Sequence, residues 1–176
     1  AIIVCKLWGL PDPRSQGSSN PGATNVMRIG GKKPALITLA GDMAKGVPLV
    51  LLAQHLQLRP DFISAIGLAA FMGHLYPVFF KFEGGKGVAT ALGVLLALYW
   101  PLGLAVIGVW IAVFALFRIS SLSSITAFAL APIIAWYLVP NYMLGIVGMS
   151  ILLIARHKTN IKALLKGEER KFSKKE

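Results

Sequence analysis

Charged side chains are scarce in this chain. They make up 14% of its 176 residues, whereas an ordinary soluble domain contains about 25%. Hydrophobic residues account for 56%, and several long stretches carry almost no charge. This deficit argues against an ordinary soluble domain and indicates an integral membrane protein.

Cysteine is nearly absent, since Cys5 is the only one in the chain. A single cysteine excludes an intrachain disulfide and any cysteine-based metal cluster. His74 lies in an apolar stretch, and no second histidine, cysteine or carboxylate is spaced to share a metal ion with it. We therefore expect no metal site and no cofactor, and interpret His74 as a hydrogen-bonded interior histidine.

Acidic residues are few, with 7 Asp and Glu against 18 Lys and Arg, so the net charge is +11. A strongly basic chain can bind nucleic acid. Here, however, the basic residues lie in loops and in a tail between apolar stretches. A basic face toward anionic lipid headgroups fits that placement better, so we expect membrane lipid rather than nucleic acid as a partner.

The apolar stretches predict an all-α bundle of seven membrane-spanning helices that forms a single domain, residues 1–176. Residues 1–10 are interpreted as the end of a first span that is truncated in this chain, and residues 11–33 as a polar loop. Residues 156–176 form a basic tail. The other spans are expected in residues 35–55, 62–80, 88–117 (two short spans), 120–138 and 142–155.

The 30 residues from Val88 to Phe117 carry no charge. One helix of that length would measure about 45 Å, whereas the hydrocarbon core is about 30 Å thick. Division at Trp100-Pro101 places sixteen of the eighteen basic residues on one side of the membrane, which is the bias expected of the cytoplasmic side. The same side then receives the polar segments 17–28, 84–90, 118–124 and 156–160.

Residues 84–90, Gly-Gly-Lys-Gly-Val-Ala-Thr, are a candidate phosphate-binding loop. Glycine backbone N–H groups followed by a helix start form an anion site, and Lys86 adds a point charge. The segment is not a Walker A loop, because Gly87 follows the lysine where Ser or Thr is needed. It is not a dinucleotide fingerprint either, since Thr90 stands where the third glycine belongs. The alternative is a flexible turn.

Two further polar segments are candidates for binding an oxygen-rich ligand. Residues 17–25 are dense in hydroxyl and amide side chains, and Arg28 beyond them suits bidentate phosphate binding; the alternative is turn and cap residues. Residues 121–126 begin a span, and Ser124 lies one turn into it. For this segment the alternative is hydrogen bonding to the helix's own carbonyls.

His157 and Asn160 share a face if the last span continues as a helix. A histidine there can donate to phosphate or act as a base near neutral pH, although a basic membrane-proximal segment is the alternative. Asp42 and Lys45 share a helix face within a span. A structural ion pair is favoured there over direct catalysis.

Together these segments resemble the PlsY family of bacterial acyl-phosphate:glycerol-3-phosphate acyltransferases over nearly the whole chain. The family usually has glycine where Ser19 stands, so this loop is restricted if the backbone there needs a positive φ. The resemblance is carried by residues 20–25 with Arg28, Asp42 with Lys45-Gly46, residues 73–90, residues 121–126, and Arg156-His157 with Asn160-Ile161, Gly167 and Glu168 or Glu169.

The resemblance implies a membrane enzyme at the cytoplasmic face of the bacterial inner membrane. It would transfer a fatty acyl group from acyl phosphate to the 1-hydroxyl of glycerol 3-phosphate. The products would be lysophosphatidic acid and inorganic phosphate, for phospholipid synthesis. The implied catalytic residues are Ser18, Arg28, Lys86, His157 and Asn160; the substrate-binding residues are Asn20, Thr24, Asn25, Gly84, Gly85, Gly87, Thr90 and Ser124; and the supporting residues are Asp42, Lys45 and His74.

The sequence gives little sign of an enzyme-bound nucleophile. Cys5 lies away from the polar loops, and no Gly-x-Ser-x-Gly elbow occurs. We therefore expect direct attack by the substrate hydroxyl, with His157 or a substrate phosphate oxygen as base. A transporter is the main rival class, but transporters usually show paired repeats around a site near the membrane midplane. A structural membrane subunit would leave the polar loops without a role.

Overall fold

The computed structural model describes residues 1–172, and every regular element in that range is helical. An all-α fold is therefore confirmed. The helices are α1 (Ile2–Leu7), α2 (Ala23–Gly30), α3 (Lys32–Ala44), α4 (Val47–His55), α5 (Pro60–Leu75), α6 (Val88–Leu98), α7 (Trp100–Phe117), α8 (Ser120–Leu138), α9 (Met143–Arg156) and α10 (Lys158–Leu165), with 3-10 turns η1 (Val78–Phe80) and η2 (Pro140–Tyr142).

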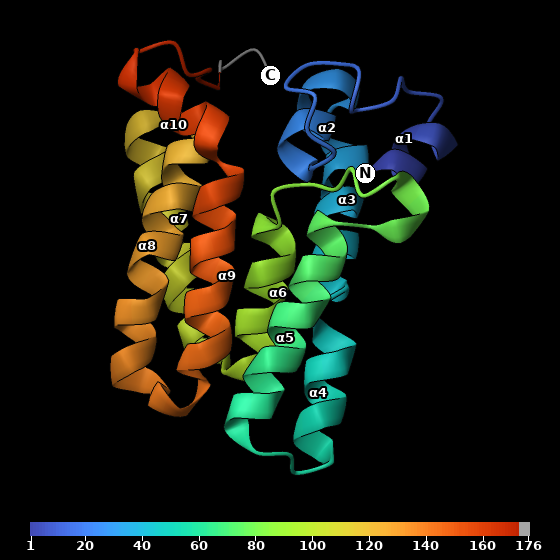
Figure 1. Ribbon diagram of the computed structural model, residues 1–176. Coiled ribbons are helices and arrows are strands. Elements are labelled where there is room, and N and C mark those ends of the chain that lie inside the picture. Colours follow the sequence, from blue (N-terminus) through green and yellow to red (C-terminus); the bar gives the residue numbers. More distant parts are fainter. Residues whose placement is uncertain (173–176) are drawn as a thin grey trace.

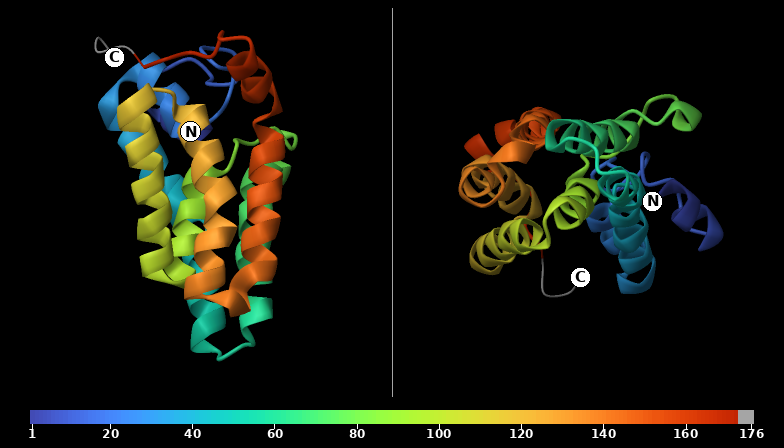
Figure 2. Two further views of the ribbon diagram at one scale, coloured as in Figure 1. Left: turned by 90° about the vertical axis from the view of Figure 1, so that its left-hand side faces the viewer. Right: turned by 90° about the horizontal axis from the view of Figure 1, so that it is seen from below.

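The long helices lie roughly side by side, whereas the short helices α1, α2 and α10 gather at one end of the bundle (Figure 1). Figure 2 shows the same arrangement from the side and from below, with α6 in the middle of the bundle. The loop before α6 lies at the same end as α2 and α10. This end therefore holds the polar segments that the sequence singled out.

Four helical stretches within the described residues are long and apolar enough to cross a membrane: Lys32–His55, Pro60–Phe80, Trp100–Phe117 and Ser120–Leu138. Two shorter apolar stretches, Val88–Leu98 and Pro140–Arg156, accompany them. The expected spans at residues 35–55, 62–80 and 120–138 correspond to three of these stretches. The sequence-based expectation of a membrane protein agrees with this pattern.

The predicted division at Trp100-Pro101 is confirmed. Tyr99 is extended, with φ −161° and ψ 105°, and α7 starts at the next residue. Pro101 occupies the first turn of α7, where its missing N–H is not needed. The 11 residues of α6 give a helix of about 16 Å, which ends inside the bundle.

The buried end of α6 needs hydrogen-bond partners, because the last carbonyls of a helix have none within it. Gln54 of α4 supplies them: its Nε2 lies 3.1 Å from the carbonyl oxygens of both Ala97 and Leu98. In a membrane this donor replaces the water that would otherwise solvate these carbonyls. The short central helix is thereby fixed to α4.

The prediction of a loop over residues 11–33 is wrong for its second half. Helix α2 covers Ala23–Gly30, and α3 begins at Lys32. The reason is tertiary: Val26 is buried with Cys5 and Ala35 in a small apolar cluster. The turn-forming composition of the segment concealed this contact. The basic tail likewise contains a helix, α10, after a break at His157.

Helix α6 provides the centre of the core. Its buried residues Val94 and Leu95 pack in one cluster with Phe71 of α5 and Phe128 of α8. A Cβ at Gly93 would overlap the carbonyl of Met43, so α3 and α6 approach closely there. This packing fixes the start of α6, and with it the preceding glycine-rich loop, against α3 and α5.

Candidate active site

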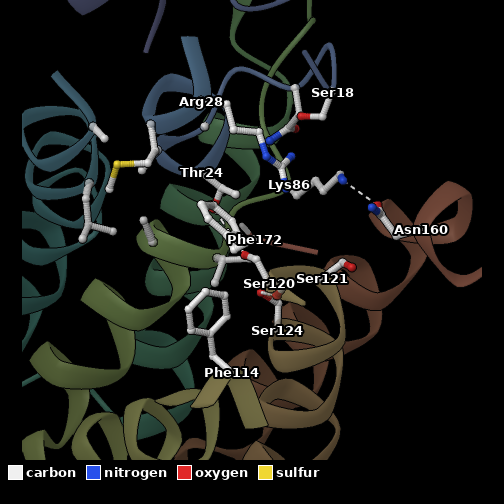
Figure 3. Close-up of a pocket in the computed structure, with 18 of the residues that line it drawn as sticks. Ser18, Thr24, Arg28, Lys86, Phe114, Ser120, Ser121, Ser124, Asn160 and Phe172 are labelled. Atoms are coloured by element: carbon white, nitrogen blue, oxygen red, sulfur yellow. Dashed lines mark hydrogen bonds between the residues drawn. The ribbon is translucent and has the colours of Figure 1, made fainter. Parts of the chain in front are cut away.

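A cavity of about 1010 Å³ opens at the end of the bundle where the polar segments meet. Its walls come from the loop before α2, from α2 and α3, from the start of α6, from α7 and α8, and from the chain beyond α9. Figure 3 shows side chains from these separate elements facing the same space. The expectation that the polar segments meet at one end is therefore confirmed.

Most of the predicted site residues line this cavity. They are Ser18, Asn20, Thr24, Arg28, Asp42, His74, Lys86, Gly87, Ser124, His157 and Asn160. The remaining predicted residues lie outside its lining. They are Asn25, Lys45, Gly84, Gly85 and Thr90.

Lys86 reaches the cavity from the glycine-rich loop, and its Nζ donates a hydrogen bond to Oδ1 of Asn160 (Figure 3). Burial lowers the pKa of the Lys86 ammonium; the Glu169 carboxylate opposes this effect, and the positive charges of Arg156 and Arg28 add to it. An ammonium has three N–H donors, of which Asn160 accepts one. The same group can therefore bind an anion in the cavity.

Glu169 orients the Asn160 amide. Nδ2 of Asn160 donates to Oε1 of Glu169 at 2.7 Å, and the Ser121 hydroxyl donates to the same oxygen at 2.7 Å. With its N–H₂ group held in this way, Asn160 presents its carbonyl oxygen to Lys86. The family pattern was the only signal in the sequence for Glu169, because its partners lie on α8 and α10.

His157 is 2% exposed, and its Nδ1 lies 2.8 Å from the carbonyl oxygen of Leu153. A carbonyl oxygen only accepts, so Nδ1 carries the proton and Nε2 has the free lone pair. Burial lowers the pKa of His157 to about 4; the Leu153 hydrogen bond opposes this, and the charge of Lys86 adds to it. His157 is therefore neutral near pH 7 and accepts hydrogen bonds at Nε2.

Arg28 faces the cavity from the last turn of α2 and lies against the C-terminal segment. Its guanidinium carbon is 4.8 Å from the centre of the Phe172 ring, a cation–π geometry. Phe172 packs edge-on against Phe114 of α7, and its N–H donates to the Arg118 carbonyl at 2.8 Å. No local pattern pointed to Phe172, because its contacts come from two distant helices.

The hydroxyl of Ser124 is engaged within the protein. It donates to the Ser120 carbonyl of its own helix at 2.9 Å and accepts from the Trp110 indole at 3.0 Å. Thr24 Oγ1 lies 3.3 Å from the Ser120 hydroxyl. These contacts correspond to the alternative interpretation of this segment, in which its hydroxyls bond to the helix carbonyls.

Asn25 shapes the loop that carries Ser18. Its Nδ2 donates to the carbonyls of Pro13 at 2.8 Å and Gln16 at 3.0 Å, and its Oδ1 accepts the Ser18 N–H at 2.9 Å. Ser19, next in this loop, has φ +54°. The family's usual glycine would adopt this left-handed backbone without strain.

The glycine-rich loop is packed tightly behind the cavity. A Cβ at Gly84 would overlap the carbonyl oxygen of His74, and one at Gly87 would overlap the ring of Phe71. Gly87 also has φ +85°, at the N-cap position just before α6. The Thr90 hydroxyl donates to the Asp42 carbonyl at 2.8 Å. These positions fix where the loop lies.

The expected ion pair between Asp42 and Lys45 forms, with Nζ and Oδ1 2.6 Å apart. Nδ1 of His74 lies 3.7 Å from the same carboxylate. Both Asp42 and His74 border the cavity. Among the described residues there is no group of three or more His, Cys, Asp or Glu that could hold a metal ion.

The fold and the site together match one class of membrane enzyme. The family model for glycerol-3-phosphate acyltransferase matches residues 1–167. Because this match spans nearly the whole chain, the chain belongs to the glycerol-3-phosphate acyltransferase family.

Individual relatives agree with this family. A glycerol-3-phosphate acyltransferase of Methylococcus capsulatus is 55% identical, covering 99% of this chain and 89% of its own length. Two crystal structures of PlsY (YgiH), an integral membrane glycerol 3-phosphate acyltransferase, are also similar. The glycerol 3-phosphate form has a TM-score of 0.92 at 40% identity and the lysophosphatidic acid form 0.89 at 39%, each covering 97% of this chain and 86% of that chain.

Proposed function

We propose that this chain transfers a fatty acyl group from acyl phosphate to the 1-hydroxyl of glycerol 3-phosphate. The products are lysophosphatidic acid and inorganic phosphate. One observation carries the proposal: Lys86, Arg28 and a neutral His157 border a single cavity. Its support from the family is that the similar PlsY structures are described as glycerol 3-phosphate and lysophosphatidic acid forms.

Both substrates carry phosphate, and among the basic residues that line the cavity Lys86 and Arg28 lie on separate elements. Lys86 on the glycine-rich loop binds the acyl phosphate and stabilises the departing phosphate as its charge develops. Arg28 on α2, with Ser18 beside it, binds the phosphate of glycerol 3-phosphate through its planar guanidinium. Lys86 donates to Asn160, and Asn160 donates to Glu169. These hydrogen bonds fix the position of the Lys86 ammonium, and so of the bound acyl phosphate, relative to His157.

The acyl chain lies along the apolar wall of the cavity. This wall continues from the polar end down α3, α6 and α7, and Leu36 and Ile111 on it are 59% and 57% exposed at the outer surface of the bundle. A product with one acyl chain can leave through that side into the bilayer. The residues of the wall are Ala35, Leu36, Leu39, Met43, Leu92, Ile107 and Ile111.

The reaction proceeds by direct attack. The 1-hydroxyl oxygen forms the new ester bond to the acyl carbon, and the bond from that carbon to the phosphate oxygen breaks with its electron pair staying on phosphate. With a pKa of about 4, His157 is a weaker base than a phosphate monoester, whose second pKa is about 6. A substrate phosphate oxygen therefore takes the proton of the 1-hydroxyl, and Nε2 of His157 orients the acceptor by accepting a hydrogen bond from its 2-hydroxyl.

The same proposal includes the setting of the enzyme. The chain is a single domain of seven spans in the bacterial inner membrane, with its cavity and C-terminus on the cytoplasmic side. The support is the charge distribution, because Arg28, Lys86, Arg118 and Arg156 all lie at the cavity end, as expected for the cytoplasmic side.

An assay of the protein in lipid nanodiscs tests the donor. Glycerol 3-phosphate is offered with acyl phosphate, acyl-CoA or acyl carrier protein, and released phosphate and lysophosphatidic acid are measured. We expect product with acyl phosphate alone. Turnover with acyl-CoA or acyl carrier protein, and none with acyl phosphate, would overturn the proposal.

Lys86→Ala should reduce kcat by about 100-fold or more, because the departing phosphate loses its charge-assisted partner in a desolvated site. The matched control is Lys158→Ala, which removes an exposed lysine at the start of α10 and should leave turnover near wild type. Equal turnover in the two variants would remove Lys86 from its proposed role.

A further inference from the structure

Arg156 is the last residue of α9 and precedes His157, but its side chain turns away from the cavity. It is not among the residues that line it. Its Nη2 instead donates to two consecutive carbonyl oxygens of the glycine-rich loop, that of Gly84 at 3.1 Å and that of Gly85 at 3.3 Å. The guanidinium also lies over the Tyr76 ring, 5.5 Å from its centre.

The opposite side of this loop is closed by the end of α5. A Cβ on Gly84 would overlap the His74 carbonyl, and one on Gly85 would overlap the His74 imidazole. The two glycines therefore lie between α5 and the Arg156 guanidinium with no room to shift toward α5. The next residue in the chain is Lys86, and Gly87 then caps the N-terminus of α6.

We propose that Arg156 is a positioning residue that holds Gly84 and Gly85 against α5 and thereby directs Lys86 into the cavity. It acts through the loop backbone rather than by touching a substrate. The consequence for catalysis rests on the proposed function, in which Lys86 binds the acyl phosphate; the consequence for the loop does not.

An arginine suits this place better than a lysine. Its planar guanidinium can donate to neighbouring carbonyls while one face rests on an aromatic ring. A lysine ammonium is a compact, strongly hydrated point charge without that shape. Arg156→Lys therefore keeps the positive charge but loses the planar guanidinium. This variant separates the effect of the charge from the effect of the side-chain shape.

The experiment compares Arg156→Lys and Arg156→Gln with the wild-type protein in nanodiscs. Hydrogen exchange of residues 83–90, followed by mass spectrometry, should be faster in both variants, with exchange of α8 unchanged. For acyl phosphate, kcat/KM should fall about tenfold or more, the loss expected for hydrogen bonds to a charged donor. The KM for glycerol 3-phosphate should stay within about twofold, because the Arg156 guanidinium donates to the Gly84 and Gly85 carbonyls and not to the Ser18 or His157 side chains.

Three controls narrow the interpretation. Lys158→Gln removes a neighbouring exposed charge and should match wild type in both measurements. Tyr76→Leu removes the ring but leaves the carbonyl hydrogen bonds, so its effect should be smaller than that of Arg156→Gln. Added guanidinium ion should partly restore the activity of Arg156→Ala but not that of Lys86→Ala.

Wild-type loop exchange and wild-type kinetics in Arg156→Lys and Arg156→Gln would overturn the proposal. A parallel rise in the KM of both substrates would overturn it as well. If Arg156→Gln does not fold, Arg156→Lys and the guanidinium rescue still decide the question. If the wild-type protein does not use acyl phosphate, the proposed function fails, and loop exchange alone decides whether Arg156 positions the loop.

Discussion

Individual residues in the cavity have charges that their surroundings set. His157 is buried and neutral, whereas Lys86 is half-buried and has the Glu169 carboxylate nearby. A neutral acceptor beside a cation suits a reaction that brings a hydroxyl to an anionic acyl phosphate. The protonation state of His157 can be measured through the pH dependence of the protein's stability.

His157 should make the protein less stable in acid. Its folded pKa of about 4 lies below its ordinary value of about 6.5. The unfolded chain therefore binds more protons between these values, and stability falls as pH drops from 6.5 toward 4, by up to about 1.4 kcal/mol per pH unit. His157→Gln should show a shallower decline of the unfolding temperature over this range.

The measurement is thermal unfolding in detergent at a series of pH values. His55→Gln, an exposed histidine at the other end of the bundle, is the matched control for the loss of a histidine. Parallel pH dependence in the wild type and His157→Gln would contradict a buried neutral imidazole at residue 157.

Ser19 carries backbone strain that a glycine would remove. A left-handed backbone costs a residue with a side chain about 1–2 kcal/mol, and the greater freedom of glycine in the unfolded chain offsets part of that gain. Ser19→Gly should therefore raise the unfolding temperature slightly and keep activity. Ser19→Ala keeps the strain and should give no such rise, so equal stability in the two variants would contradict this explanation.

At the scale of elements, α6 determines the geometry of the site. It begins at the glycine-rich loop and ends inside the bundle, so its position depends on contacts at both ends. Gly87 and Thr90 fix the start, and Gln54 supplies donors at the finish. A short buried helix of this kind is possible in a membrane only where its terminal groups are satisfied by protein.

Gln54→Leu should destabilise the protein by about 1–3 kcal/mol, since it leaves the Ala97 and Leu98 carbonyls without this donor in a dry environment. Unfolding temperature in detergent is the readout. Gln54→Glu keeps the shape of the side chain and has no N–H donor when ionised, so it should be at least as destabilising. A wild-type unfolding temperature in both variants would refute the capping role.

At the scale of the whole molecule, the site belongs to no single segment. The cavity is lined by residues from α2 and α3, from α7, α8 and α10, and from the start of α6. In the ribbon, α6 lies between α3 and the group of α7, α8 and α10 (Figure 1). The C-terminal segment connects the two sides of the cavity, because Phe172 contacts both Arg28 of α2 and Phe114 of α7. Polar groups occupy one end of the cavity and apolar side chains the other, as an enzyme acting on a lipid requires.

Much of the helix arrangement could be predicted from the local amino-acid sequence. The long uncharged stretches predicted the spans, Pro101 predicted the break before α7, and the bias of basic residues predicted that the polar loops share one end. These features depend on hydropathy, on backbone sterics and on charge, all of which act over short distances along the chain. The glycine-rich loop was visible from its local composition, whereas the other residues of the family pattern were identified by their resemblance to a known family.

The sequence by itself therefore determined an α-helical protein with membrane-spanning stretches, the break before α7, and the gathering of the polar loops at one end of the bundle. Only the tertiary structure decided that residues 23–30 are helical, because Val26 becomes buried against Cys5 and Ala35. It also decided which nitrogen of His157 is free, and that Glu169 and Phe172 complete the cavity. Those outcomes depend on groups far apart in the chain, whose contacts no local pattern encodes.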